Sequence, residues 1–146
     1  MVSGLTLENG RDALARYYLA TLQSIAYGTR HIINTLVEAG HQINRLVICG
    51  GATKNPLWLR EYANATRREI HLPQEENAVN LGAALLGAVA CDSFENVTQA
   101  AKSMVRDGNV IRPEKETFLF HQAKYQVYLQ MYRDQQQYNK IMQTCG

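Results

Sequence analysis

Apolar side chains recur at intervals of three and four residues along the first part of the chain. This spacing places one apolar face on a long helix, which we expect over residues 9–39, with Asn9 as its N-cap and Gly40 as its stop. A helix of about 30 residues would be about 45 Å long, which is too long for the surface of so small a domain. We call this face the N-terminal stripe, and it consists of Leu14, Tyr18, Leu22, Ile25, Thr29, Ile32 and Leu36.

The next part of the chain, residues 45–90, alternates short apolar runs with helical patterns. Leu46 to Cys49 is a continuous apolar run, typical of a strand covered on both faces of a parallel sheet. Asn55 and Pro56 predict a helix start, because Asn is a favoured N-cap and Pro a favoured first helical residue. The pattern predicts a β-α-β-α unit with a right-handed crossover, made of strands at 46–49 and 69–72 and helices at 56–65 and 77–90.

The last part, residues 96–142, is mainly helical in its pattern. Asn96 is the expected cap of a helix from Val97 to Met104, and residues 107–109 and 112–113 are expected to form loops. A final helix over 118–142 has a predicted apolar face that carries Tyr125, Tyr128, Leu129, Tyr132 and Ile141. Only two strands are expected in all, whereas a typical sheet has about five or six. The chain is therefore expected to be part of a larger α/β domain.

A glycine pair, Gly50 and Gly51, directly follows the first expected strand. Without a Cβ the backbone can turn sharply there, and a flat ligand can approach it closely. The helix that starts after Asn55 would also offer its free N–H groups to an anion at the carboxyl end of the sheet. An ordinary strand-to-helix turn explains the same residues. The loop is not a Walker A motif, because the sequence contains no GxxxxGK[ST].

Composition and charge argue against several functional classes. The 146 residues carry a formal net charge of +2, so we expect no nucleic-acid or membrane partner. The longest apolar candidate, residues 78–90, is shorter than the roughly 18 residues that a membrane span needs. Cys49, Cys91 and Cys145 have no CxxC spacing, which favours reduced thiols and a cytoplasmic setting. The four histidines are far apart in sequence, so no metal ligand is assigned. No GxSxG motif occurs, so no nucleophile is assigned.

Four motifs together resemble the C-terminal part of the FGGY carbohydrate kinases, nearest to the ribulokinase-type branch that acts on pentuloses. They are GLTL at 4–7, LQSIAYGTRHII at 22–33, VICGGATKNPLWLREYANAT at 47–66 and ENAVNLGAALLGAVA at 76–90. The resemblance covers nearly the whole chain. It implies an α/β fold that is the C-terminal part of an actin-like ATPase (ribonuclease H-like) domain, helix-rich with a short parallel sheet. Residues 1–146 would then be a partial C-terminal domain.

The resemblance also implies a nucleotide site. Gly50, Gly51 and Ala52 would form the adenosine motif, with Gly51 and Asn55 beside ATP. An N-cap role alone explains Asn55 equally well, and Gly82 is expected only to let its helix approach a neighbour.

Several aromatic and charged side chains are better explained by packing than by ligand contact. Trp58 and Tyr62 lie one helical turn apart, which favours core packing over base stacking. Tyr27 and Arg30 are expected to make core and inter-helix contacts and not to bind substrate.

The family's sugar pocket, catalytic aspartate and Gly-Thr phosphate hairpin have no counterpart in these residues. No catalytic residue is assigned, because no candidate aspartate matches the family's catalytic motif. The candidates are Asp12, Asp92, Asp107 and Asp134. Proton abstraction needs a positioned base, and phosphoryl transfer needs Mg²⁺ and phosphate clamps. We expect the nucleotide-side part of an ATP- and Mg²⁺-dependent kinase for a pentulose or related polyol. The chain alone is expected to be inactive.

Two other hypotheses remain open. One is a non-catalytic truncated isoform that binds nucleotide weakly or pairs with a partner protein. The other is a nucleotide-binding module unrelated to kinases. Under any of the three, the N-terminal stripe has too little sheet to cover it, so association into a homo-oligomer is expected.

Overall fold

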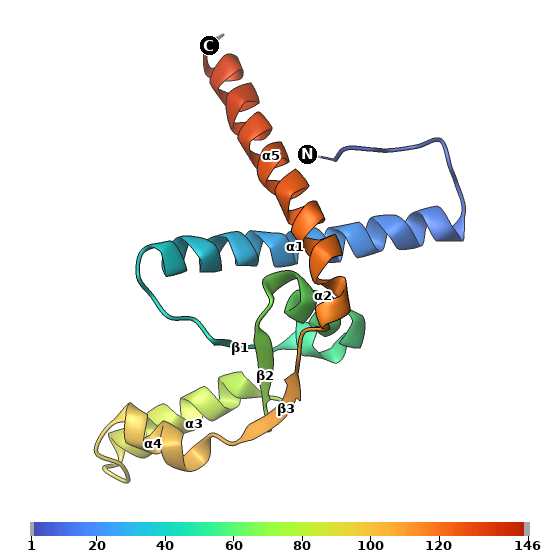
Figure 1. Ribbon diagram of the computed structural model, residues 1–146. Coiled ribbons are helices and arrows are strands. Elements are labelled where there is room, and N and C mark those ends of the chain that lie inside the picture. The colour runs from blue at the N-terminus through green and yellow to red at the C-terminus, as the bar shows by residue number, and fades with distance from the viewer. Residues whose placement is uncertain (1, 145–146) are drawn as a thin grey trace.

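The computed structural model describes residues 2–144, which form a helix-rich α/β structure around one small sheet (Figure 1). The elements are α1 (Arg11–Glu38), β1 (Arg45–Val47), the 3-10 helix η1 (Gly51–Lys54), α2 (Pro56–Thr66), β2 (Glu69–Pro73), α3 (Ala78–Ala90), α4 (Val97–Met104), β3 (Asp107–Ile111), the 3-10 helix η2 (Lys115–Thr117) and α5 (Phe118–Gln143). Each α-helix lies within two residues of its expected ends. Figure 1 shows α5 crossing α1, with its C-terminal half projecting beyond the rest of the molecule.

The sheet has the strand order β1-β2-β3. β1 and β2 are parallel, with Leu46 opposite Ile70, which confirms the expected parallel pair. β3 pairs antiparallel with β2, with Ile111 opposite Ile70, so the prediction of a loop at residues 107–109 is wrong. Asp-Gly-Asn favours turns locally, but pairing with a distant strand decides the outcome. The sheet is therefore mixed and three-stranded.

Gly108 makes this pairing possible. A Cβ at Gly108 would lie 2.8 Å from the Leu72 carbonyl oxygen and 3.0 Å from the Gln74 nitrogen. Both contacts are with backbone atoms, which cannot move aside without disrupting β2. The glycine that favours a loop in the sequence is thus required for the close approach of β3 to β2.

β1 is covered on one face only. Leu46 and Ile48 pack against the core, whereas the side chain of Val47 is 66% exposed. The expectation of a strand covered on both faces is therefore wrong for the residues described. The run at 46–49 is apolar at every position, so the sequence alone does not indicate that one face of the strand is open.

The core lies where α1, α2, α5 and the sheet meet. Ala26 on α1 and Ala63 on α2 are completely buried, and such small side chains allow two helices to pack closely. Ile70 of β2 and Tyr125 of α5 complete the contact. The core cluster thus joins the first helix, the β-α-β unit and the last helix.

The N-terminal stripe faces away from this core except at Leu22, which is buried, and at Thr29, whose hydroxyl is hydrogen-bonded to Tyr62 of the core. Five of its members are 40–69% exposed, namely Leu14, Tyr18, Ile25, Ile32 and Leu36. The buried face of α1 instead carries Ala13, Leu22, Gln23, Ala26, Tyr27, Arg30 and Ile33. The expectation that the stripe lacks a sheet to receive it is confirmed for the described residues. Asn9 is not the N-cap, because Gly10 occupies that position with φ of 105° and no side-chain bond.

The apolar face predicted for α5 is buried only in its first half. Tyr125 is buried, and Tyr128 and Leu129 pack against the core. Tyr132 is 45% exposed and Ile141 is 61% exposed, because the second half of α5 projects beyond α1. The structure thus places the first half of the predicted face in the core and leaves Tyr132 and Ile141 largely open to solvent.

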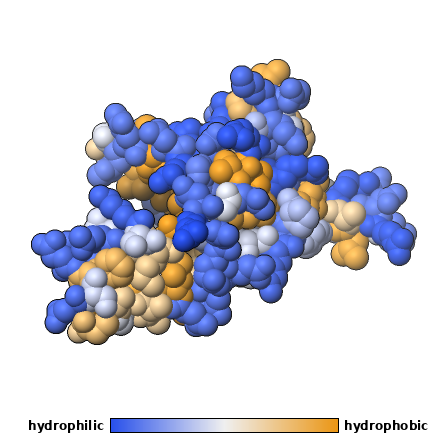
Figure 2. All heavy atoms as spheres, turned by 90° about the horizontal axis from the view of Figure 1, so that it is seen from below, coloured by the Kyte–Doolittle hydropathy of each residue, from blue (hydrophilic) through white to orange (hydrophobic). Residues whose placement is uncertain are grey.

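Helix α3 leaves most of its apolar surface open. Val79 is 81% exposed and Leu86 is 61% exposed, whereas Leu85 is buried. A Cβ on Gly82 would meet no atom within 4 Å, so the expectation that Gly82 admits a neighbouring helix is wrong in the described chain. Figure 2 shows apolar surface gathered on the side of the molecule where α3 and α4 lie.

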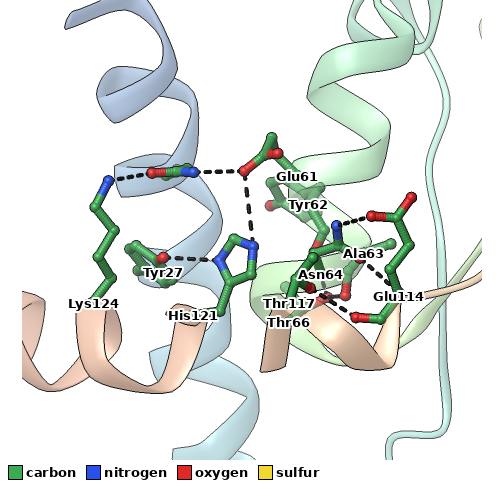
Figure 3. Close-up of polar contacts among 11 residues, drawn as sticks. Tyr27, Glu61, Tyr62, Ala63, Asn64, Thr66, Glu114, Thr117, His121 and Lys124 are labelled. Carbon is green, nitrogen blue, oxygen red and sulfur yellow. Dashed lines mark hydrogen bonds and ion pairs between the residues drawn. The ribbon is translucent and has the colours of Figure 1, made fainter. Parts of the chain in front are cut away.

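A buried polar network joins α5 to α1 and α2 (Figure 3). The Tyr27 hydroxyl and His121 Nδ1 share a hydrogen bond of 2.9 Å, and His121 Nε2 lies 3.9 Å from Glu61 Oε2. Gln23 donates to the same carboxylate oxygen at 2.6 Å, and Lys124 donates to the Gln23 amide oxygen. Because the network holds polar groups away from water, loss of one member leaves its partners unsatisfied.

Burial controls the protonation of this network. It lowers the pKa of the His121 imidazole, and the Glu61 carboxylate opposes that shift. It also lowers the pKa of the Lys124 ammonium and raises the pKa of the Tyr27 phenol. The folded state therefore favours the neutral form of His121 near neutral pH.

No helix among the described residues is both long enough and apolar enough to cross a membrane.

We predict that Gly108→Ala destabilises the protein by about 1–3 kcal/mol, because the new methyl group would overlap the backbone of β2. Gly82→Ala is the matched control. Its methyl group meets open space, and alanine replaces glycine inside a helix, so a gain of up to about 1 kcal/mol is expected. Chemical denaturation measures both free energies of unfolding. Equal effects at the two positions would contradict the close β2–β3 approach.

The lowered pKa of His121 predicts a pH-dependent stability. The unfolded chain binds a proton at His121 near pH 6.5, whereas the folded chain binds it only at lower pH. The free energy of unfolding should therefore fall as the pH decreases below about 6.5. The slope is at most about 1.4 kcal/mol per pH unit, because the two states differ by no more than one proton at this imidazole.

Denaturation between pH 8 and pH 5 measures this dependence. His121→Gln should show a flatter profile than the unaltered chain, because the substituted side chain does not titrate. The exposed His41→Gln is the control, and the same flattening there would contradict the assignment to His121.

Candidate functional site

The glycine turn, residues 50–52, lies at the carboxyl end of β1. Gly50 has φ of 92°, a backbone conformation that side chains disfavour, so glycine is required there for the turn itself. Gly51 has no positive φ and begins η1. The Thr53 amide and hydroxyl both donate to the Gly50 carbonyl oxygen, at 3.1 and 2.6 Å. The turn is thus fixed by its own hydrogen bonds.

The surface of the glycine turn is open. A Cβ built on Gly50 or on Gly51 would meet no atom within 4 Å, and both residues and Ala52 are exposed. This space lets a flat ligand lie directly against the backbone. In the described residues the turn is thus an open surface and not a closed pocket.

Asn55 connects the glycine turn to α2 and to α1. Its side-chain Oδ1 accepts a hydrogen bond of 3.1 Å from the Trp58 amide, which confirms the predicted N-cap. Its Nδ2 donates to the Tyr18 hydroxyl at 2.9 Å. Both ends of the amide are therefore engaged within the protein, and a ligand contact through this side chain would replace one of these bonds.

Trp58 and Tyr62 pack together on α2, as expected from their spacing. Their ring centroids are 4.3 Å apart with an interplanar angle of 30°. Tyr62 is buried, and its hydroxyl is hydrogen-bonded to Thr29. Trp58 is half-buried against the core. The prediction of core packing for these two rings is confirmed.

Tyr27 and Arg30 make the inter-helix contacts that the sequence predicted. Both are buried. Arg30 Nη2 donates to Gln122 Oε1 at 2.6 Å, and its guanidinium group lies 4.2 Å from the centre of the Tyr125 ring. These contacts connect α1 to α5.

The described residues 2–144 bring together no group of three His, Cys, Asp or Glu side chains that could hold a metal ion. The four aspartates considered from the sequence lie on separate elements. Cys145, counted among the thiols, lies outside the described residues. The side chains present here do not form a Mg²⁺ site, so no chemical step is derived through Mg²⁺.

The sequence did not place Thr53 or Tyr18 in this region, although Tyr18 was expected on the N-terminal stripe. Thr53 follows Gly50 by three residues, and a hydroxyl at that spacing commonly closes a turn, so a local signal was present. Tyr18 lies 37 residues before Asn55, and no local pattern pairs them.

The comparison with known proteins identifies the domain. A family model described as the FGGY family of carbohydrate kinases, C-terminal domain, matches residues 1–91. The FGGY carbohydrate kinase domain-containing protein of Xenopus laevis is 44% identical over 142 residues, which are 97% of this chain and 26% of that protein. A ribulokinase of Anoxybacillus flavithermus is 34% identical over 122 residues, which are 79% of this chain and 22% of that protein. The chain spans about a quarter of the length of these curated relatives.

Solved structures give the same fold. The xylulose kinase of Rhodospirillum rubrum is similar with a TM-score of 0.73 at 24% identity, covering 93% of this chain and 27% of that chain. The glycerol kinase of Plasmodium falciparum with ADP is similar with a TM-score of 0.66 at 19% identity, covering 88% of this chain and 26% of that chain. The expected α/β fold, the C-terminal part of an actin-like ATPase domain, is confirmed.

Substitutions at Asn55 separate its two bonds. We predict that Asn55→Ala lowers the free energy of unfolding by about 1 kcal/mol through loss of the helix cap. Asn55→Asp keeps an oxygen for the Trp58 amide and should retain most of that stability. Tyr18→Phe removes only the second bond and should cost about 0.5 kcal/mol or less. Chemical denaturation compares the three variants, and an equal loss for Asp and Ala would contradict the dominance of the cap.

Proposed function

The chain belongs to the FGGY family of carbohydrate kinases, and we propose that it forms the nucleotide-side wall of an ATP-dependent sugar kinase. The substrate we propose is a pentulose or related polyol, because ribulokinases are among the relatives. The kinase activity belongs to a whole protein of which this chain matches about a quarter.

The observation that carries the proposal is the open backbone at Gly50 and Gly51. A nucleotide base or ribose can lie directly against backbone that carries no side chain, and no atom occupies the space beside either glycine. The turn also lies at the carboxyl end of a parallel strand, where α/β sheets commonly bind ligands. The similar glycerol kinase structure from Plasmodium falciparum contains ADP, which supports ATP as the nucleotide.

The residues of the glycine turn and Asn55 have different proposed roles. Gly50 forms the turn, and the backbone of Gly51 and Ala52 contacts adenosine. Asn55 holds the start of α2, since both ends of its amide are engaged within the protein. The proposed contacts are made mainly by the backbone and not by reactive side chains. Such a surface is suited to binding a ligand and not to catalysis.

The segment after residue 91 is proposed to belong to the same unit. The family model ends at residue 91, but the match to the Xenopus relative covers 97% of the chain. The buried network of His121 and Lys124 with α1 and α2 fixes α5 on the first part of the chain. We therefore treat residues 1–146 as one partial kinase domain.

A second candidate function is a non-catalytic interaction module. The exposed N-terminal stripe favours it, because Ile25 and Ile32 are 51% and 61% exposed. Such a module would bind nucleotide weakly or associate through α1, including with a second copy of the chain.

Nucleotide binding tests the first proposal. We predict that the purified 146-residue chain binds ATP weakly, with a Kd on the order of 1 mM, and shows no ADP release with pentuloses. Gly51→Val should weaken ATP binding at least about tenfold, because its side chain fills the open space. The free energy of unfolding should change little there, since no neighbouring atom is displaced.

Gly82→Val is the control, since it adds the same side chain in open space on α3. Isothermal titration and a coupled ADP-release assay provide the measurements. Equal ATP affinity for both variants would contradict the glycine turn as the nucleotide wall. Sustained sugar-dependent turnover by the 146-residue chain would contradict its expected inactivity.

A further inference from the structure

A basic cavity lies at the other end of the sheet from the glycine turn. Its volume is about 390 Å³, within the range of about 300–1,000 Å³ typical of small-molecule sites. It is formed where β1 and β2 begin and β3 ends. We call it the basic pocket, and its charged lining residues are Arg67, Arg68, Glu69, Arg112 and Lys115. Four cationic side chains thus face one carboxylate.

Two of the arginines are held in place by the protein. Arg67, which ends α2 in a left-handed conformation, donates from Nη2 to the Phe118 carbonyl oxygen at 2.9 Å. Its guanidinium group also lies 4.9 Å from the centre of the Phe118 ring. Arg68 Nη1 donates to the Arg67 carbonyl oxygen at 3.2 Å. Fixed guanidinium groups lose less conformational entropy when they bind a ligand.

The remaining cations lie on segments that are also fixed. Arg112 Nε donates to Glu69 Oε1 at 3.1 Å. Lys115 follows Glu114, whose amide donates to Asn64 Oδ1 at 2.8 Å (Figure 3). Asn64 is almost fully buried in α2. The pocket is therefore assembled by α2, β2, β3 and η2 and not by one flexible loop.

The charge of the basic pocket is not balanced within the described residues. Glu69 is shared between Arg112 and His71, whose Nε2 lies 3.3 Å from Glu69 Oε2. The Nε–H groups of Arg67 and Arg68 are buried and have no hydrogen-bond partner among residues 2–144. A buried donor without a partner costs free energy, and a bound anion would offset the uncompensated positive charge of these guanidinium groups.

We propose that the basic pocket binds a phosphate dianion, as inorganic phosphate or as the phosphate group of a small phosphomonoester. Arginine guanidinium groups match phosphate oxygens through paired, charge-assisted hydrogen bonds. The site is separate from the glycine turn, because it lies at the opposite end of the sheet and none of its lining residues belongs to the turn. It goes beyond nucleotide binding and gives the domain a second ligand.

Nuclear magnetic resonance of the arginine Nε–H groups tests the proposal directly. The 146-residue chain is titrated with sodium phosphate, and in a second series with ribulose 5-phosphate, at constant ionic strength set with sodium chloride. Saturable shifts of Arg68 and Arg112 are expected in at least one series, with a Kd of about 1–10 mM. Saturation by both ligands would show that the pocket recognises the phosphate group that they share. Saturation by only one would show whether the pocket binds inorganic phosphate or the phosphomonoester.

Charge variants predict changes of opposite sign. Arg112→Gln with Lys115→Gln should weaken binding at least about fivefold, whereas Glu69→Gln should strengthen it about threefold. Arg60→Gln, an exposed charge on α2 outside the pocket, should leave the affinity unchanged. A merely structural role for these residues would not produce tighter binding in Glu69→Gln.

Three outcomes would overturn the proposal. The first is shifts that do not saturate in either series, or that chloride reproduces. The second is equal losses in Arg60→Gln and in the pocket variant. The third is loss of phosphate binding in Gly51→Val, which would place the anion at the glycine turn. Retained phosphate binding in Gly51→Val, whatever its ATP affinity, supports a separate site.

Discussion

Packing of α2 between α1 and the sheet positions both candidate ligand sites. Ala63 on α2 and Ala26 on α1 are completely buried, so the two helices approach without intervening side chains. The N-terminus of α2 then fixes the glycine turn through Asn55, and its C-terminus presents Arg67 to the basic pocket. A change in the α1–α2 contact would therefore displace both ends of α2, and with them both candidate sites, although the two sites do not contact each other.

Helix α5 depends on a different kind of interaction. Its buried half is held by His121 and Tyr125, and burial lowers the pKa of the His121 imidazole, which favours its neutral form. A network of this kind adds directional specificity to apolar packing, but each member becomes costly once a partner is lost. The segment that follows the family match is thus tied to the domain by polar groups that satisfy one another.

Local signals in the sequence predicted local features well. The predicted caps at Asn55 and Asn96 each accept a backbone hydrogen bond at a helix start, because capping involves residues only three positions apart. β3 was missed because its Asp-Gly-Asn segment favours turns, and its pairing with β2 depends on distant residues. The buried face of α1 was predicted only in part. Tyr27 and Arg30 were expected to make inter-helix contacts, but Gln23 was not, since it is polar and its partners Glu61 and Lys124 lie on α2 and α5. The glycine turn was found from the sequence, but the basic pocket was not, because the fold brings its residues together from separate segments.

The two sites differ in what prepares them for a ligand. At the glycine turn the backbone is already fixed, since Thr53 closes the turn and Asn55 is engaged at both ends. A flat ligand would therefore bind without ordering the loop, and most of the available binding energy would remain as affinity. At the basic pocket the fixed elements are charges of one sign held near each other. This arrangement costs stability without a ligand, and a bound anion offsets that cost. Stability should accordingly rise with phosphate through the basic pocket and with nucleotide through the glycine turn, by independent amounts.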